Sequence, residues 1–256
     1  MNNSPDSISR PDGARIAYRK LAGGAPGVMF LGGFHSDMTG TKATALEAHC
    51  RAVGRAFVRF DYTGHGASSG EFEEGTIGRW AEDAVAVLDE VAEGPQVLVG
   101  SSMGGWIMLL AALARPERVC GLVGVAAAPD FTEDLIWNEL PDEARRAMER
   151  DGRRLRPSEY DEAGYPITLR LIEEGRAHLL LRRPIAISCP VRLIHGERDG
   201  EVPWEVSRRL SEALASEDVT LTLVEEGDHR LSEPADLERL MAVVDGLCSQ
   251  IENSRG

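Results

Sequence analysis

Short apolar runs alternate with amphipathic stretches along most of this sequence, and this alternation restricts the folds that the chain can adopt. Strand-like runs occupy residues 14–21, 27–31, 55–60, 96–101, 119–127, 191–196 and 219–224, and helical stretches occupy about 41–53, 76–92, 103–114, 204–215 and 234–252. From Gly27 onward the runs are mainly apolar rather than alternating, as in strands that are buried on both faces. The sequence therefore predicts an α/β fold in which helices cover both faces of a mostly parallel central sheet.

One region interrupts this rhythm. About sixty residues separate the apolar run that ends near Ala128 from the next one, and they contain helical pieces at 132–139, 141–151 and 167–181 but no convincing strand. Connections of this length are commonly lids or binding elements. Because the chain has no linker-like tract or internal repeat, we expect a single α/β domain over residues 1–256, with a helical lid insertion at about 129–189.

The sequence GSSMG at residues 100–104 matches the pattern G-x-S-x-G, with Ser102 at its centre. The pattern alone is weak, but here it directly follows the apolar run QVLVG and directly precedes a helical stretch. A nucleophile elbow has this strand–turn–helix context, and its glycines leave room for the strained serine. The helix N-terminus then directs N–H groups toward a developing oxyanion. We therefore predict that Ser102 is a nucleophile rather than a helix cap.

A serine hydroxyl needs an adjacent base to act as a nucleophile near neutral pH. Among the six histidines, His229 is best placed, because it lies in the loop between the last predicted strand and the last predicted helix. His65 belongs to a glycine-rich turn and is expected to be structural. His195 ends a strand and is expected to be a buried hydrogen-bonding residue, with catalysis as the less favoured alternative. His49 and His178 lie in predicted helices, where a solvated or packed role is the default.

The base in turn needs a carboxylate that fixes its tautomer and stabilises the imidazolium. Asp199 follows the run VRLIHG in the tight loop HGERDGEVP, and we predict that it orients His229. Asp130, after the preceding strand, is the rival. The chain order of serine, aspartate and histidine is the one expected of an α/β-hydrolase fold.

An oxyanion hole requires two backbone N–H donors. We expect one from Met103, the residue after the nucleophile, and one from Phe34 in the loop LGGF at residues 31–34. Loss of one such donor typically costs about 3–4 kcal/mol of transition-state stabilisation.

The charge balance excludes several partners. The chain has 42 acidic and 28 basic residues, for a formal net charge of −14. Nucleic acid is disfavoured because phosphate binding needs clustered positive charge, and an anionic membrane surface is disfavoured for the same reason. No apolar stretch is long enough for a membrane span. The polar N-terminus has no signal-peptide core, so we expect a cytoplasmic protein, with a mitochondrial location as the alternative in a eukaryote.

Cysteine and lysine usage adds little to this picture. The four cysteines, at 50, 120, 189 and 248, form no C-x-x-C pair and have no histidine at metal-site spacing, so we expect no metal and no organic cofactor. Lys20 and Lys42 are the only lysines, which we attribute to genome composition.

With these residues assembled, the chain resembles the α/β-hydrolase superfamily and, more narrowly, the α/β-hydrolase domain-containing protein 10 group. That group comprises palmitoyl-protein thioesterases that also hydrolyse acyl glucuronides such as that of mycophenolic acid. The resemblance is carried by GTKA (40–43), RFDYTGHGASSG (59–70), GPQVLVGSSMGGW (94–106), ARPERV (114–119), CPVRLIHGERDGEVPW (189–204) and DHR (228–230). It implies that Ser102, Asp199 and His229 fall on the triad of that group.

The resemblance implies cleavage of a thioester or carboxylic ester in a small molecule or an acylated protein, through an acyl-enzyme. A C–C bond hydrolase or an acyltransferase with the same triad stays open. An epoxide hydrolase or dehalogenase is disfavoured because those members carry aspartate at the elbow, and a non-catalytic receptor would more readily lack a triad member.

Two features of the insertion bear on the substrate. Phe131, Leu135, Ile136 and Trp137 are expected either to wall an apolar acyl pocket or to pack the lid onto the core. The run RRAMERDGRRLR at residues 145–156 carries six arginines beside two acids. We expect it to form a solvated helix face with i,i+4 pairs, with attraction of an anionic leaving group as the alternative.

Overall fold

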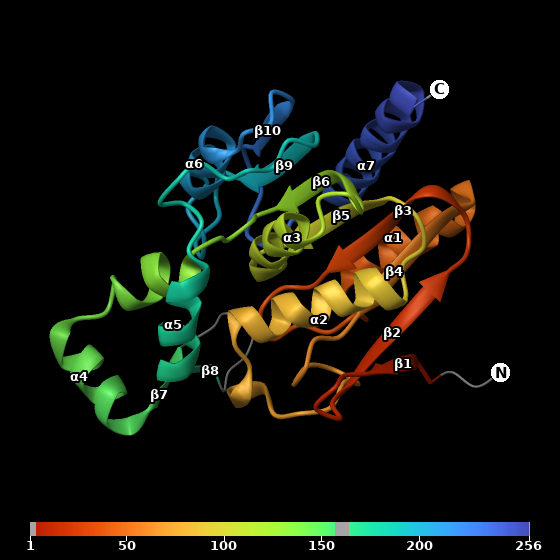
Figure 1. Ribbon diagram of the computed structural model, residues 1–256. Coiled ribbons are helices and arrows are strands. Elements are labelled where there is room, and N and C mark those ends of the chain that lie inside the picture. Colours follow the sequence, from red (N-terminus) through yellow and green to blue (C-terminus); the bar gives the residue numbers. More distant parts are fainter. Residues whose placement is uncertain (1–3, 157–163, 256) are drawn as a thin grey trace.

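The computed structural model describes residues 4–156 and 164–255. Within those residues an eight-stranded sheet, in the order β1-β2-β4-β3-β5-β6-β9-β10, forms the centre of the molecule (Figure 1). Its strands are β1 (Asp6–Ser9), β2 (Arg15–Leu21), β3 (Gly24–Leu31), β4 (Arg55–Phe60), β5 (Gln96–Ser101), β6 (Val119–Val125), β9 (Val191–Gly196) and β10 (Val219–Val224). The helices against it are α1 (Thr41–Val53), α2 (Ile77–Glu90), α3 (Met103–Ala114), α6 (Glu205–Ala213) and α7 (Pro234–Arg255), and a short 3-10 turn, η1 (Phe72–Glu74), precedes α2.

The strand directions confirm the predicted mostly parallel sheet. The six strands from β4 across to β10 run parallel to their neighbours, whereas β2 pairs antiparallel with both β1 and β4. The strands at 55–60, 96–101, 191–196 and 219–224 have the predicted bounds, as do α1 and α3. Apolar runs that alternate with amphipathic stretches therefore located the elements that form the sheet.

The two edges of the sheet differ from expectation. β1 was not predicted, because its sequence DSIS is short and polar and gives no hydrophobic pattern. β10 was expected to be buried on both faces, yet Thr220 and Leu223 are exposed. Both strands pair on one side only, which leaves part of their surface in solvent.

Successive side chains of the inner strands point to opposite faces of the sheet. Met29 and Leu98 pack in one core together with α2, α3 and α6, while Val28 and Val97 pack in a second core together with α1 and α7. Figure 1 shows α2 and α3 on one side of the sheet and α1 and α7 on the other. Helices thus cover both faces, as predicted.

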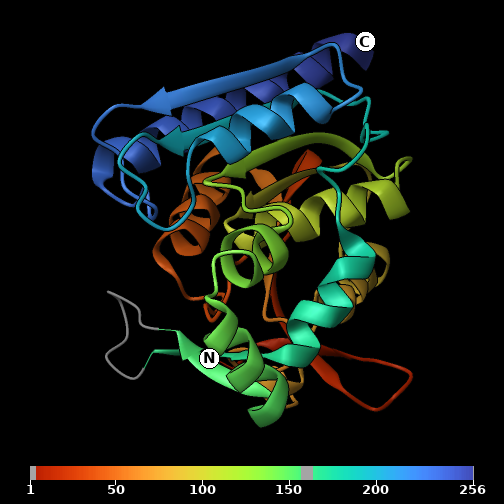
Figure 2. The same cartoon turned by 90° about the vertical axis from the view of Figure 1, so that its left-hand side faces the viewer.

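The described residues between β6 and β9, where the sequence predicted a lid insertion, contribute no strand to the central sheet. This segment contains η2 (Thr132–Trp137), α4 (Asp142–Asp151), β7 (Arg153–Arg156), β8 (Tyr165–Thr168), α5 (Leu169–Gly175) and η3 (Arg176–His178), and it extends from one end of the sheet (Figures 1 and 2). The expectation of no strand here was wrong, because β7 and β8 pair as an antiparallel ribbon. RRLR and YPIT are too short to show strand periodicity. Residues 157–163, also assigned to the lid, lie outside the described residues.

In the described part of the chain, no helix has the combination of length and apolar character that crossing a membrane requires.

Candidate active site

Ser102 lies in the turn between β5 and α3, where its backbone has φ 54° and ψ −121°. A residue with a side chain pays about 1–3 kcal/mol for such a conformation. A Cβ atom added at Gly100 would lie 2.4 Å from the carbonyl oxygen of Gly104, and one added at Gly104 would lie 2.1 Å from that of Leu31. Only glycine fits at these two positions, and the turn holds the Ser102 side chain at the carboxyl end of β5.

The predicted oxyanion donors flank this turn. Met103 is the first residue of α3, so its N–H group has no acceptor within the helix. Phe34 lies in the loop after β3 and lines the same cavity as Ser102. In that loop, a Cβ atom on Gly33 would lie 3.4 Å from the Ser102 Cβ atom. The loop therefore reaches the nucleophile, and the roles of Phe34 and Met103 stay predictions.

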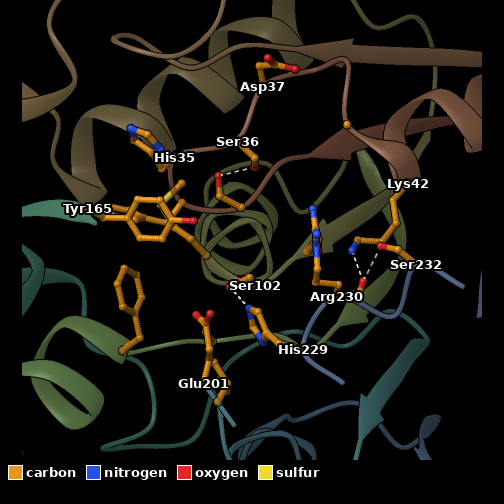
Figure 3. A pocket seen from close by; sticks show the side chains of 18 of the residues that line it. His35, Ser36, Asp37, Lys42, Ser102, Tyr165, Glu201, His229, Arg230 and Ser232 are labelled. Atoms are coloured by element: carbon orange, nitrogen blue, oxygen red, sulfur yellow. Dashed lines mark hydrogen bonds between the residues drawn. The ribbon is translucent and has the colours of Figure 1, made fainter. Parts of the chain in front are cut away.

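His229 comes to Ser102 from the loop between β10 and α7. Its Nε2 atom lies 3.0 Å from the Ser102 Oγ atom (Figure 3). Its Nδ1 atom lies 2.7 Å from Oδ2 of Asp199. When Nδ1–H donates to the carboxylate, Nε2 is left to accept the serine proton. The structure thus brings together three side chains that are up to 127 residues apart in sequence.

Asp199, just beyond β9, is held by several donors. Its Oδ1 atom accepts hydrogen bonds from the backbone N–H groups of Glu201 and Val202, at 2.9 and 2.8 Å, and its Oδ2 atom lies 3.1 Å from Nε2 of His195. Burial alone would raise the pKa of Asp199, but the bonds to His195 and His229 outweigh it and hold the pKa well below its usual range. The carboxylate is therefore ionised and fixed in orientation.

Asp130, the rival carboxylate, has different partners. Its two oxygens accept hydrogen bonds from the backbone N–H groups of Leu180 and Leu181, at 2.7 and 2.9 Å, and burial raises its pKa. Arg182 lies 3.4 Å away. The carboxylate thus ties the two ends of the insertion together, while Asp199 makes the contact with His229.

Two other histidines have the environments expected of them. His65 is buried, and burial lowers its pKa to about 4; its ring packs edge-on against Trp80. His195 is fully buried, with Nδ1 2.7 Å from Oγ of Ser207 and Nε2 2.9 Å from the carbonyl oxygen of Val202. The sequence patterns did not indicate that His195 also contacts Asp199.

A cavity of about 390 Å³ opens beside Ser102 and His229. Its apolar wall includes Phe34, Phe131, Leu135, Ile136 and Ile167, and its polar wall includes Ser36, Asp37, Lys42, Glu201, Arg230 and Ser232. In Figure 3, Tyr165 and His35 lie on one side of Ser102, and Lys42 and Ser232 lie on the other. The volume falls in the range of small-molecule sites. Lys42 and Arg230 were not predicted to belong here: Lys42 had been attributed to genome composition, and next to Arg230 only His229 had been assigned a role.

The structure corrects the prediction for Trp137. Phe131, Leu135 and Ile136 line the cavity, but the lining residues do not include Trp137. Its indole ring instead lies beside two guanidinium groups, 5.0 Å from Arg176 and 5.8 Å from Arg145. Trp137 is partly buried and packs against the main hydrophobic core, so for this residue the alternative role, packing the lid onto the core, is the one observed.

The arginine-rich run is not the single helix face that was expected. Its first part lies on α4, where Arg150 pairs with Asp151 at 2.8 Å, and its last part forms β7. On β7, Arg153 pairs with Glu73 at 2.6 Å, which fits the expected solvated pairing but not the i,i+4 spacing. Arg156 lines the cavity.

No metal site was expected from the sequence, and candidate metal ligands can be checked in the described ranges. Within residues 4–156 and 164–255, no group of three or more His, Cys, Asp and Glu side chains is arranged to hold a metal ion. The four cysteines, all within the described residues, form no disulfide. Catalysis without a cofactor stays a prediction.

The sequence model of the Alpha/beta hydrolase family matches residues 25–241, a span that includes Ser102, Asp199 and His229. The chain belongs to the α/β-hydrolase family. Its eight-stranded sheet has the mostly parallel arrangement with helices on both faces that the sequence predicted.

Within this family, the chain is similar to proteins named palmitoyl-protein thioesterase ABHD10, mitochondrial. The human protein is 44% identical over 245 residues, which cover 95% of this chain and 80% of the human one. The protein from Bos taurus is 45% identical over the same shares. These similarities confirm the resemblance on which the sequence predictions drew.

Solved structures of this α/β-hydrolase family show the same relationship. Alpha/beta hydrolase domain-containing protein 10 from mouse superposes with a TM-score of 0.91 and 43% identity, over 97% of this chain and 99% of the mouse chain. A putative hydrolase from Agrobacterium vitis S4 also gives a TM-score of 0.91, with 40% identity over 95% of this chain and 98% of that one.

Proposed function

We propose that this α/β-hydrolase cleaves thioesters or carboxylic esters through a covalent acyl-enzyme on Ser102. The observation that carries the proposal is the contact of Ser102 Oγ with His229 Nε2 at 3.0 Å, while His229 Nδ1 lies 2.7 Å from Asp199. Nucleophile, base and orienting acid thus stand within hydrogen-bond reach of one another. Membership of a hydrolase family, and similarity to proteins named thioesterase, support the same chemistry.

In the first step, Ser102 Oγ attacks the carbonyl carbon of the substrate while His229 Nε2 takes the hydroxyl proton. The negative charge of Asp199 stabilises the imidazolium that forms. The backbone N–H groups of Met103 and Phe34 are proposed to hold the oxyanion. The tetrahedral intermediate then expels the thiolate or alkoxide, which takes the proton from His229 and leaves an ester on Ser102.

In the second step, His229 removes a proton from a water molecule as its oxygen attacks the acyl carbon. Collapse of this intermediate returns the proton to Ser102 Oγ and releases the carboxylic acid. Each proton removed by His229 is given back within the same half-reaction, so the two steps leave the site unchanged.

The acyl group is proposed to lie against the apolar wall of the cavity. Phe131, Leu135 and Ile136 come from the insertion, and Phe34 packs edge-on against Phe131 with ring centroids 5.9 Å apart. Such a surface favours an alkyl chain over a charged acyl group. The relatives' name, palmitoyl-protein thioesterase, supports a fatty acyl chain as the group transferred.

We also propose that the insertion belongs to one domain with the sheet. Ile136, Ile172 and Leu180 share a single apolar core with Leu98 and Leu122 of the strands. The word mitochondrial in the relatives' names favours the mitochondrial alternative over the cytoplasmic one. Fractionation of cells that express the native gene would decide between the two compartments.

The decisive experiment is Ser102→Ala, assayed on short-chain and palmitoyl substrates with thioester, oxygen-ester and acyl-glucuronide head groups. We expect wild type to favour long acyl chains, and the variant to retain less than a few per cent of wild-type turnover on every substrate. A variant that keeps more than that, with an unchanged fold by circular dichroism, would refute the proposal. Analysis of the products would distinguish hydrolysis from acyl transfer.

A further inference from the structure

Lys42 occupies an unusual position in this protein. It lies in the first turn of α1, a turn without an acidic residue, where a positive charge opposes the helix dipole. It is one of two lysines among 28 basic residues. Burial and the charge of Arg230 lower its pKa to about 8, against the opposing effect of Asp228 and Asp236. A residue that violates local preferences in this way often serves function rather than stability.

The contact that Lys42 makes joins α1 to the loop of His229. The Lys42 ammonium group donates a hydrogen bond to the carbonyl oxygen of Arg230, the residue that follows His229. Ser232 Oγ donates to the same oxygen at 3.0 Å, and Figure 3 shows both side chains converging on it. The carbonyl oxygen one residue beyond the base is thus held from a separate element of the fold.

The loop is held differently before and after His229; within it, the N–H group of Leu231 donates to Oδ1 of Asp228 at 2.9 Å. Before His229, the carbonyl oxygen of Gly227 accepts a hydrogen bond from the N–H group of Arg198 at 3.0 Å, which ties it to the end of β9. After His229, Leu231 is buried but its backbone has φ 43°, in the left-handed region. A non-glycine residue is held there only by its surroundings.

We propose that Lys42 is a positioning residue, which holds the loop after His229 so that the imidazole stays within reach of Ser102. The inference rests on the proposed function, because it assigns Lys42 a role through His229. Displacements near 1 Å at a catalytic group can cost about 100-fold in rate. The compact ammonium group reaches a single carbonyl oxygen, which the broad guanidinium fork of an arginine would match less well.

Two charged groups around Lys42 belong to the loop, Arg230 and Asp228, and one belongs to α7, Asp236. Asp37, on the loop before α1, lines the same cavity. On β4, the guanidinium group of Arg59 donates hydrogen bonds to the carboxylate of Glu47 and to the carbonyl oxygen of Met38. The hydrogen bond to Arg230 is charge-assisted while Lys42 is protonated, so it weakens as the pH rises through about 8.

The first test compares Lys42→Met with Lys20→Met, which removes the other lysine. Lys20 lies on β2 and pairs with the exposed Glu93. We expect Lys42→Met to lower kcat about 30-fold with KM changed less than threefold, and Lys20→Met to match wild type. The Tm of Lys42→Met should equal or exceed that of wild type, because burial lowers the pKa of Lys42 and its charge is therefore costly to the folded state. A rise in KM at unchanged kcat, or a kcat within twofold of wild type, would overturn the proposal.

The second test uses Lys42→Arg and the pH profile. Above about pH 8 we expect the kcat of wild type to fall as Lys42 loses its proton, and the arginine variant to have a lower kcat without this alkaline limb. Superimposable profiles would overturn the proposal. The Lys42→Arg variant also keeps the proposal testable if Lys42→Met fails to fold.

Labelling of Ser102 by a fluorophosphonate, with displacement of fluoride, separates the two levels of inference. If wild type is not labelled, the proposed function fails. If wild type is labelled and Lys42→Met is labelled equally fast, only the role of Lys42 fails. We expect labelling of Lys42→Met to be slowed in proportion to its kcat.

Discussion

The turn that carries Ser102 and the loop that carries His229 face each other across 3.0 Å, yet they are held in different ways. The Ser102 turn is fixed by close backbone packing, since Gly100 lies against Gly104, and Gly104 lies against the carbonyl oxygen of Leu31 on β3, with no space for a Cβ atom at either glycine. The His229 loop is held by separate hydrogen bonds, from the N–H group of Arg198 just beyond β9, from Lys42 on α1, and from Leu231 and Ser232 within the loop itself.

This difference indicates how each half of the site fails. A change within the Ser102 turn forces the backbone apart, so it should disturb folding and catalysis together. A change around His229 leaves the sheet intact, so it should lower the rate while the fold survives. Variants on the two sides can therefore be sorted by comparing Tm with kcat.

The largest effect on rate is expected for Asp199→Asn. An amide can still accept the hydrogen bonds from Glu201 and Val202, but it cannot stabilise the imidazolium of His229. We expect kcat to fall about 10⁴-fold, as in other triads with this change, with little effect on KM. Steady-state kinetics would measure this, with Asp218→Asn, an exposed partner of Arg192, as the matched control.

Acid titration of wild type sharpens the same prediction. Because the folded-state pKa of Asp199 is held below its usual value, the stability contributed by its charge is present above the unfolded pKa of about 3.9. It is lost only as the pH falls through the lower folded-state pKa. Loss of the stability contributed by Asp199 already at pH 5 would contradict the assigned environment, as would a kcat for Asp199→Asn within tenfold of wild type.

Gly104→Ala is expected to affect folding and rate together. The new methyl group would lie 2.1 Å from the carbonyl oxygen of Leu31, so α3 must move away from β3. We expect a loss of about 1–3 kcal/mol of unfolding free energy and roughly a 100-fold lower kcat. Chemical denaturation and kinetics would report both effects.

Gly246→Ala on α7 is the matched control for this substitution. Its added methyl group meets nothing within 4 Å, so it should raise stability by up to about 1 kcal/mol without changing the rate. If the Gly104 variant proved as stable and active as this control, the Ser102 turn would not be the rigid side of the site.

The smallest effect is expected for Ser232→Ala. This change removes the weaker of the two donors to the carbonyl oxygen of Arg230 and leaves Lys42 in place. We expect kcat/KM to fall less than about threefold in the single variant, and more than additively when it is combined with Lys42→Met. A double-mutant cycle measures that coupling, and strict additivity would mean that the two donors do not act on one anchor.

Much of the fold could be predicted because buried elements need apolar residues, and these residues form recognisable patterns along the chain. Strands such as 96–101 and 191–196 are apolar throughout, since the parallel sheet is covered on both faces, and their bounds were predicted correctly. Elements stabilised by other means were missed. β1 and β7 are short and polar, and β8 has only four residues, so their pairing depends on neighbours rather than on a hydrophobic pattern.

The sequence by itself determined where the Ser102 turn lies, because a strand, a glycine-flanked serine and a helix follow one another in consecutive residues. Only the tertiary structure decided what surrounds the turn. It placed His195 against Asp199, packed Trp137 against the core outside the cavity lining and brought Lys42 to the loop of His229. These contacts join residues from separate elements, and the direction in which a side chain points is fixed by packing rather than by the spacing of residues along the chain.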